Sequence, residues 1–333
     1  MKSIFKRFFL TIIIGSVAVP TVNTVNIFTT TVSDNQHQYL IAGLDDAAAN
    51  TDVLIIVSYN AVSNEAAVLQ IPRDTYCRFG GNQNKINQLY AHFLRQEGVS
   101  ELAMEKTTDF IGDIFGISFD GYVAITTDGF RNAVDSIGGV WVNLSEGFIY
   151  NSSRGEDSFV LSKGENLLDG KKAEVFVRHR KSYAMGDLGR IDAQKIFFSG
   201  LYTTITERTG FDKLINLAMS FGKGVITDFS LTEAMAVFIK SFSKLRHAAI
   251  TYVTMPGESF CHSDGTWYYV LNKNACNKLF ADKMLVESVF DSKGICTDSL
   301  ESGIDRIYHD GNITYREYSQ GQISEIKIPR SMR

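Results

Sequence analysis

The apolar positions of this chain fall into short runs separated by polar and glycine-containing stretches. Such runs, rich in β-branched residues, are typical of buried strands. The strand candidates are residues 39–43, 53–59, 66–71, 121–125 and 140–144. Pro72 ends the third run, because proline lacks the backbone donor that would continue a strand ladder. A further strand-like run covers residues 266–271.

Other stretches repeat apolar residues at the spacing of a helix. In residues 100–116, Phe110, Ile111 and Ile114 lie on one helical face, and Ser100 is a candidate N-cap. Further helices are expected from Asp128 to Ile137, from a cap at Asp169 toward Val177, and from about Leu188 to Arg208. Strands that alternate with helices indicate an α/β protein with a mixed sheet covered by helices.

The beginning of the chain has the pattern of a targeting segment. Lys2, Lys6 and Arg7 precede an apolar run from Phe8 to Val19, which suits a signal-peptide core. The run is shorter than the ~20 apolar residues of a full membrane span, so a cleaved signal and a retained anchor both stay open. We therefore expect the protein on the extracytoplasmic face of the cell membrane, or secreted into the cell wall.

The domain organisation follows from these patterns. We predict a signal peptide or membrane anchor over residues 1–22 and a polar spacer over 23–38. A single α/β domain would cover residues 39–290. Residues 291–333 are polar and weakly patterned, so we interpret them as a C-terminal tail or a small appended hairpin.

The cysteines agree with an oxidising compartment outside the cytoplasm. There are four, Cys77, Cys261, Cys276 and Cys296, and no C-x-x-C spacing that would indicate zinc. Cys261 and Cys276 flank the strand-like run at 266–271 and could close a small loop. The alternative is four unpaired buried thiols.

The charge balance excludes a general attraction to nucleic acid. The formal net charge is −4, and residues 1–20 carry three basic groups and no acid, so the remainder stands at −7. An acidic chain without a basic recognition helix does not suit DNA binding. An anionic ligand must therefore be held by a local cluster of arginines.

Two such arginine groups stand at the ends of predicted elements. Arg73 follows directly on the strand that Pro72 terminates, at a sheet edge where α/β sites usually lie. Arg178 and Arg180 are two residues apart, so in an extended segment they point the same way and suit the oxygens of a diphosphate. His179 would then point away. The alternative in each case is a solvated turn or edge.

Acidic and amide residues complete the candidate chemistry. Asp187, Arg190 and Gln194 have spacings of three and four, which place them on one face near a helix N-terminus, where anions are favoured. Asp187 could hold an arginine or act as a base. Asp45 and Asp52 stand at neighbouring strand ends, and two carboxylates facing a diphosphate would hold Mg²⁺ (or Mn²⁺). Surface salt bridges and turn formation are the alternatives.

These elements, in this order, resemble the LytR–CpsA–Psr family over roughly residues 39–290. The resemblance is carried by Gly43-Leu44-Asp45, Thr51-Asp52, Ile71-Pro72-Arg73-Asp74-Thr75, Lys85-Ile86-Asn87, Asp128-Gly129-Phe130, Asp135-Ser136-Ile137-Gly138-Gly139-Val140, Leu168-Asp169-Gly170, Val177-Arg178-His179-Arg180, Asp187-Leu188-Gly189-Arg190-Ile191-Asp192-Ala193-Gln194 and Met255-Pro256-Gly257-Glu258.

The resemblance implies an α-β-α sandwich around a central mixed β-sheet that binds polyprenyl pyrophosphate lipids, with the acyl chain in an apolar tunnel. It also assigns roles to residues of this chain. Substrate binding would fall to Arg73, Lys85, Arg178, Arg180, Arg190 and Gln194, metal binding to Asp45 and Asp52, and catalysis to Arg73, Arg178, Arg180 and Asp187.

The implied activity is a Mg-dependent phosphotransferase that moves a glycopolymer, such as teichoic acid or capsular polysaccharide, from the lipid carrier to a peptidoglycan hydroxyl. Polyprenyl phosphate would be released. A diphosphate hydrolase and a non-catalytic polyprenyl-phosphate-binding or regulatory envelope protein are the alternatives. The chain departs from the family at Asn50, where an arginine is usual two residues before the second metal aspartate. This departure favours the binding-only alternative.

Overall fold

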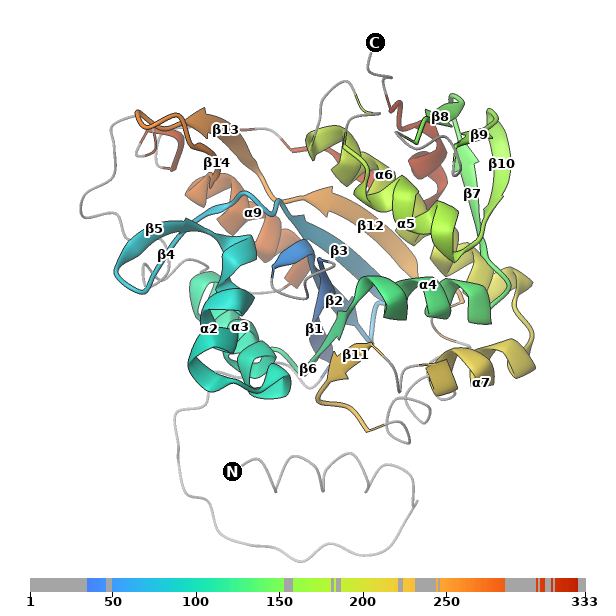
Figure 1. Ribbon diagram of the computed structural model, residues 1–333, viewed down its shortest axis with the longest axis horizontal. Coiled ribbons are helices and arrows are strands. Elements are labelled where there is room, and N and C mark those ends of the chain that lie inside the picture. The colour runs from blue at the N-terminus through green and yellow to red at the C-terminus, as the bar shows by residue number, and fades with distance from the viewer. Residues whose placement is uncertain are drawn as a thin grey trace, which may run out of the picture. The chain divides into compact units, whose positions relative to one another are not determined.

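The computed structural model describes residues 35–45, 50–152, 158–180, 183, 187–220, 224–230, 244, 246–284, 304, 306–308, 313 and 315–328 (Figure 1). These residues belong to one compact unit that spans positions 34–333. The predicted signal or anchor at 1–22 and Cys296 lie outside the described residues. None of the helices described is both long and apolar enough to cross a bilayer.

A mixed sheet of seven strands forms the centre, in the order β11–β6–β1–β2–β3–β12–β15 (Figure 1). Two neighbouring pairs are parallel, β1 with β6 and β3 with β12, and the other pairs are antiparallel. The strands are β1 (Gln36–Leu44), β2 (Thr51–Asn60), β3 (Glu65–Ile71), β6 (Gly121–Ile125), β11 (Val225–Thr227), β12 (Ala249–Thr254) and β15 (Glu317–Ser319).

Four two-stranded ribbons surround this sheet. They pair β4 (Tyr76–Phe79) with β5 (Asn82–Lys85), β7 (Val140–Leu144) with β10 (Gly164–Leu168), β8 (Phe148–Tyr150) with β9 (Phe159–Leu161), and β13 (Gly257–Cys261) with β14 (Trp267–Leu271).

Helices cover both faces of the central sheet (Figure 1). One face carries α2 (Leu89–Glu97), α3 (Ser100–Phe115) and α9 (Lys273–Met284); the other carries α4 (Thr127–Ser136), α5 (Gly170–Arg178), α6 (Asp187–Thr203) and α7 (Phe211–Ser220). Short helical turns are η1 (Ile86–Gln88), η2 (Thr204–Arg208) and η3 (Gln320–Glu325). The predicted α-β-α sandwich around a mixed sheet is therefore confirmed.

The two faces of the sheet are packed differently. One face, which we call the packed face, turns Leu40, Ala42, Leu54, Ile56 and Leu69 into a fully buried core with Phe115 and Phe280. The strand alternation turns the other face toward α4, α5 and α6. On β12, Ile250 and Tyr252 of this face belong to a second buried core. We call the rest of this face the half-buried face. Its members are Tyr39, Ile41, Val53, Val57 and Val123, which the strand register places side by side and which stay partly accessible.

The helix ends can be compared with the caps and starting residues that the sequence predicts. Asp169 accepts a hydrogen bond from the backbone of Lys172 at 2.8 Å, so the predicted cap of α5 is confirmed. The helix predicted over 100–116 begins at Ser100 as expected, but Ser100 is not its N-cap, because Val99 takes that position and makes no side-chain cap. The predicted start of α4 at Asp128 is wrong by one residue: the helix begins at Thr127, and Thr126 caps it.

Two predictions about the C-terminal part need correction. Residues 317–325 do not form a tail or a separate hairpin, because β15 pairs with β12 at the sheet edge and Ile323 is buried beside it. The other domain limits stay predictions. Cys261 and Cys276 do not close a loop: Cys261 is exposed on β13, whereas Cys276 is buried in α9, where burial raises the pKa of its thiol.

Candidate functional site

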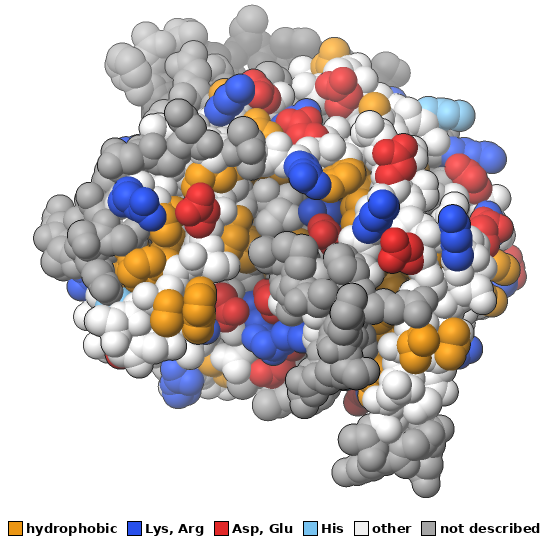
Figure 2. All heavy atoms as spheres, turned by 90° about the horizontal axis from the view of Figure 1, so that it is seen from above, with side chains coloured by type: hydrophobic (Ala, Val, Ile, Leu, Met, Phe, Trp, Pro, Cys, Tyr) orange, Lys and Arg blue, Asp and Glu red, His pale blue; other side chains and the backbone are white. Residues whose placement is uncertain are grey.

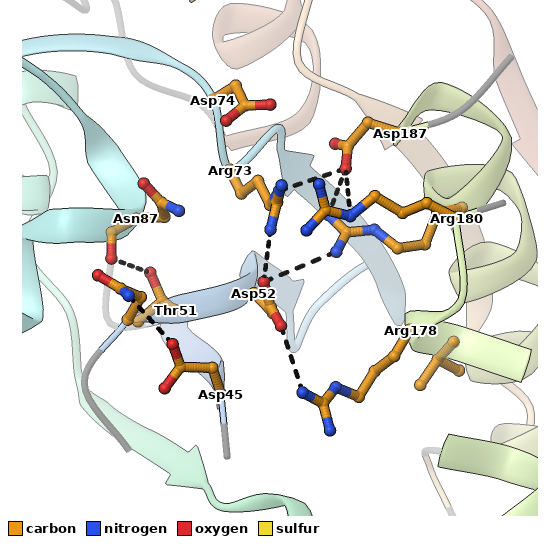
Figure 3. Close-up of polar contacts among 12 residues, drawn as sticks. Asp45, Thr51, Asp52, Arg73, Asp74, Asn87, Arg178, Arg180 and Asp187 are labelled. Carbon is orange, nitrogen blue, oxygen red and sulfur yellow. Dashed lines mark hydrogen bonds and ion pairs between the residues drawn. The ribbon is translucent and has the colours of Figure 1, made fainter. Parts of the chain in front are cut away.

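The topology brings five chain segments together where the central strands end. Since β1 and β3 run antiparallel to β2, the last residues of β1 and β3 and the first residues of β2 lie at the same end of the sheet. Asp45, Asp52 and Arg73 stand at those three positions. The end of α5 and the start of α6 reach the same place, where Arg178 (Figure 3) and Arg190 both lie near Asp52. The predicted meeting of distant arginines is therefore observed.

Asp52 owes its orientation to an irregularity in the strand ladder. Gly43 lies opposite Val53, but Leu44 lies opposite Thr51, so Asp52 is an extra residue in β2, as in a β-bulge. Bulges re-aim side chains and are common beside active sites. The Asp52 carboxylate lies 2.7 Å from Arg73 Nη1, and guanidinium nitrogens of Arg178 and Arg190 lie at 3.7 and 3.8 Å (Figure 3).

Asp187 forms the second centre of the cluster. Its Oδ1 lies 2.9 Å from Arg190 Nη2, 3.3 Å from Arg73 Nε and 3.8 Å from Arg180 Nε. Asp187 is the first residue of α6, and Arg190 follows one helical turn later on the same face, as the spacing predicts. The two carboxylates together hold guanidinium groups from four positions, and Arg73 and Arg190 touch both.

Arg190 is the most deeply buried charge of this cluster, with 1% of its surface exposed. Burial lowers the pKa of its guanidinium, and the neighbouring Asp187 opposes this shift. An arginine stays charged even so, because its intrinsic pKa lies far above neutrality. The Nε atom of Arg190 is buried and, among the described residues, finds no hydrogen-bond acceptor. A buried donor of this kind suits an anionic ligand.

The cluster has an excess of positive charge. The guanidinium groups of Arg73, Arg178, Arg180 and Arg190 outnumber by one the carboxylates that they contact, which are Asp52, Asp187 and Glu174. On the molecular face seen from above, basic and acidic side chains are interspersed with apolar ones (Figure 2). The excess is therefore a local property of the cluster, in a chain that is acidic overall.

Arg178 reaches the cluster from a helix, so the predicted extended segment is wrong at this residue. It is the last residue of α5, and only at His179 does the backbone become extended. Arg178 Nη1 lies 2.8 Å from Glu174 Oε1 and donates to Thr127 Oγ1 at 3.1 Å. The i,i+4 spacing of Glu174 and Arg178 was visible in the sequence, whereas Thr127 gave no local signal.

The remaining predicted residues lie around the cluster in different settings. The ring of His179 packs against the ring of Tyr150, with 4.8 Å between the two centroids. This packing does not indicate a role as a base. Lys85 Nζ lies 3.0 Å from Asp74 Oδ1, and no contact with the arginine cluster is recorded for it among the described residues. The backbone N–H of Asn87, two residues on, donates to the carbonyl of Arg73 at 3.2 Å.

Gln194 is buried and engaged through both ends of its amide. Its Nε2 donates to the carbonyl of Val177 at 2.9 Å, and its Oε1 accepts from Nε2 of Gln70. Sequence reasoning missed Gln70, because nothing near it in the sequence indicates a polar role for a residue inside a strand. The predicted contact between Gln194 and a phosphate stays a prediction.

The carboxylates of Asp45 and Asp52 fit a partial set of Mg²⁺ ligands. Asp45 Oδ2 accepts from Asn50 Nδ2 at 3.0 Å, and its backbone N–H donates to the Asn50 carbonyl at 2.9 Å. In the part of the chain that the structure describes, no three His, Cys, Asp or Glu side chains gather around one point. Mg²⁺ commonly takes one or two carboxylates and completes its shell with phosphate oxygens and water. Two aspartates beside the arginine cluster would agree with this preference, and Mg²⁺ binding here stays a prediction.

The apolar tunnel that the resemblance implies stays a prediction. Two cavities, one of about 220 Å³ between α6, β7 and η3 and a smaller one beside Leu144 and Phe148, have none of the site arginines in their walls. The half-buried face offers partly accessible apolar side chains on the side of the sheet that carries α5 and α6 (Figure 1). A lipid chain on this face stays a prediction.

Comparison with known proteins identifies relatives that match most of the chain. TagU of Oceanobacillus iheyensis, named a polyisoprenyl-teichoic acid–peptidoglycan teichoic acid transferase, is 28% identical over 72% of this chain and 72% of its own. TagV of Bacillus subtilis, with the same transferase name, is 28% identical over 60% of this chain and 51% of its own.

Solved structures share the fold. Bacillus subtilis TagV superposes with a TM-score of 0.61 at 23% identity, over 76% of this chain and 98% of that one. A LytR-Csp2A-Psr enzyme from Actinomyces oris gives 0.59 at 19% identity, over 78% and 91%. The sequence model of the LytR_cpsA_psr family matches residues 18–284. Family model, relatives and fold agree with the order of motifs in the sequence, and the chain belongs to the LytR–CpsA–Psr family.

Proposed function

We propose that this chain is a phosphotransferase that moves a glycopolymer from a polyprenyl diphosphate carrier to a hydroxyl of peptidoglycan and releases polyprenyl phosphate. Membership of the family and the transferase names of its relatives support the reaction class. The observation that carries the proposal for this chain is the meeting of four guanidinium groups at one place, where the buried Nε of Arg190 has no acceptor among the described residues. A diphosphate esterified at both ends carries two negative charges, which these groups would hold.

In the proposed reaction the arginines hold the diphosphate while the acceptor oxygen attacks the glycan-side phosphorus. The bond from that phosphorus to the bridging oxygen breaks, and the lipid keeps the bridging oxygen as its terminal phosphate. Charge therefore develops on the leaving phosphate, where fixed guanidinium groups stabilise it without reorganising. Arg73 and Arg190 suit this role because both are largely buried and held by two carboxylates.

The proton of the acceptor hydroxyl needs a base, and Asp187 is the candidate that the sequence predicts. Asp187 also holds the guanidinium groups of Arg73, Arg180 and Arg190 in place. The two roles separate in a pH profile of Asp187→Asn. Loss of a base changes the pH dependence of the rate, whereas loss of a counter-ion lowers substrate affinity at every pH.

Asp45 and Asp52 are the residues that would hold Mg²⁺. The ion, when bound, would neutralise charge on the phosphate oxygens. Asn50, which stands where the family usually has an arginine, donates to Asp45 and so keeps one of the two carboxylates oriented. This contact favours an active enzyme over a binding-only protein.

The half-buried face is the proposed surface for the polyprenyl chain. Tyr39, Ile41, Val53 and Val57 offer partly accessible apolar area on the side of the sheet that carries α5 and α6 (Figure 1). Burying such area on a lipid stabilises the complex in proportion to the area covered. The proposed partners are thus a membrane-borne lipid carrier and peptidoglycan, which implies a place outside the cytoplasm, with residues 1–22 as signal or anchor.

The test measures transfer of a lipid-diphosphate-linked glycan to peptidoglycan by the full chain in detergent. We expect Arg178→Ala and Arg180→Ala to lower the transfer rate. Arg208→Ala, which removes a basic residue paired with Glu165 away from the cluster, serves as the matched control. Product analysis without peptidoglycan distinguishes transfer from hydrolysis. Transfer at the wild-type rate by both cluster variants would rule out this assignment.

A further inference from the structure

A buried polar side chain interrupts the apolar surface of the half-buried face. Gln70 lies on β3, opposite Ile55 of β2 and Thr254 of β12, and only 3% of it is exposed. Its Nε2 donates to Oε1 of Gln194 on α6, which is 1% exposed. Gln194 in turn donates to the carbonyl of Val177 in α5. The two amides form a directional chain from the sheet to α6 and on to α5.

This chain of hydrogen bonds joins the three segments that carry the arginine cluster. Arg73 follows Gln70 by three residues, Arg178 follows Val177 directly, and Arg190 precedes Gln194 by one helical turn. The chain also lies beneath the charges, since both amides are buried and Arg190 is buried beside them. A change in its geometry therefore moves the guanidinium groups relative to one another.

The chemistry of the site explains why an amide suits this position better than an apolar residue. Replacing a buried hydrogen-bonded pair by well-shaped apolar groups is nearly neutral for stability, whereas leaving one partner unsatisfied costs about 1–3 kcal/mol. The pair of linked amides therefore contributes about as much to the free energy of unfolding as a methionine or leucine pair would. What they add is direction, because each donor must face one acceptor.

We propose that Gln70 is a positioning residue of the transferase, which orients the amide of Gln194 and thereby sets the spacing of the arginines that hold the two phosphates. The inference rests on the proposed function, because it takes the bound group to be a diphosphate. Two phosphates held at once demand a fixed distance between the guanidinium groups, whereas a single phosphate does not. Gln70 would therefore matter more for a diphosphate than for a monophosphate.

The experiment compares Gln70→Met, which keeps the shape and removes the donor, with Gln36→Met. Gln36 is a matched control because it is also a glutamine buried in the central sheet, at 6% exposure, where it donates to Ser58 near the far end of β1. Calorimetry would give the dissociation constants of farnesyl diphosphate and farnesyl monophosphate, and thermal melting would give Tm. We expect Gln70→Met to weaken diphosphate binding by about tenfold, which corresponds to 1.4 kcal/mol.

The control variant and the monophosphate separate positioning from loss of stability. Both methionine variants should lower Tm, but Gln36→Met should leave both dissociation constants unchanged. Gln70→Met should change the monophosphate constant less than the diphosphate constant. Equal weakening of both ligands, or equal effects of the two variants on binding, would overturn the inference.

A second variant keeps the test decisive if Gln70→Met does not fold. Glu at position 70 accepts but does not donate when ionised, so Gln194 must turn its NH₂ group toward it and its oxygen toward the carbonyl of Val177. We expect Gln70→Glu to weaken diphosphate binding at least as much as the methionine. If Gln70→Glu binds the diphosphate with wild-type affinity, the inference about Gln70 is wrong, but the proposed function is not affected. If the wild-type protein does not bind farnesyl diphosphate, the proposed function fails as well.

Discussion

The two faces of the central sheet differ in how completely their side chains are buried. The packed face closes Leu40, Leu54 and Leu69 against α2, α3 and α9, with none of these side chains measurably exposed. The half-buried face leaves Tyr39 and Ile41 partly accessible on the side of the sheet that carries α5 and α6, the helices that bring Arg178 and Arg190 (Figure 1). One sheet thus combines a closed core with a surface that carries the candidate site.

The contrast separates stability from binding along single strands. Leu40 and Ile41 are neighbours in β1, yet their side chains point to opposite faces, because strand residues alternate. A cavity on the packed face weakens the fold, since that core is closed. A change on the half-buried face removes less buried area and alters the surface beside Asp52 and Arg73. Variants on the two faces should therefore separate in stability and ligand assays.

The largest effect is expected from Arg190→Met, which removes the buried charge and keeps an apolar stem. Transfer should fall by roughly 10²–10³-fold, the usual cost of losing one group that stabilises developing charge. The effect on the free energy of unfolding should be smaller than the effect on transfer, because Asp52 and Asp187 stay paired with Arg73 and the methionine occupies part of the buried space. Transfer kinetics and urea unfolding give the two quantities. A transfer rate close to that of the wild type would exclude Arg190 from the site.

Leu54→Ala probes the packed face and should show the opposite pattern. The side chain is fully buried, so its truncation should lower the free energy of unfolding by about 2–5 kcal/mol. The affinity of the folded fraction for farnesyl diphosphate should not change. Chemical denaturation and calorimetry below the unfolding transition measure the two effects. A marked loss of affinity would mean that the two faces are coupled.

The elements that the sequence predicted well are those with local signals. The central strands were recognisable from continuous apolar runs, and α5 from its cap at Asp169. β15 was missed, because three polar and aromatic residues at a sheet edge owe their conformation to pairing with β12. In the site, Arg73, Arg178 and Arg190 were predicted from motifs and spacing, whereas Gln70 and Thr127 act through contacts distant in sequence.

Ile41→Ser tests whether the half-buried face receives the lipid. Ile41 lies between Ile55 and Val123, so a hydroxyl there should weaken binding of farnesyl diphosphate by roughly 5- to 10-fold, in line with the loss of part of one apolar side chain. Binding of inorganic diphosphate should stay the same, because it has no apolar tail. Ala42→Ser, which points to the packed face, is the control and should affect stability instead. A parallel loss of both ligands would argue against a lipid on this surface.

The smallest effect is expected from Asn50→Ala, which removes the hydrogen bond to Asp45. A hydrogen bond of this kind contributes about 0.5–1.5 kcal/mol, so Mg²⁺ binding in the presence of farnesyl diphosphate should weaken by roughly two- to tenfold. Asn166→Ala on β10, which removes the side-chain hydrogen bonds of Asn166 to the backbone of Ser162 and Gly164, should leave Mg²⁺ binding unchanged. Titration calorimetry with Mg²⁺ measures both. If Asn50→Ala binds Mg²⁺ like the wild type, Asp45 is held by other contacts and the departure from the family arginine has no bearing on the metal.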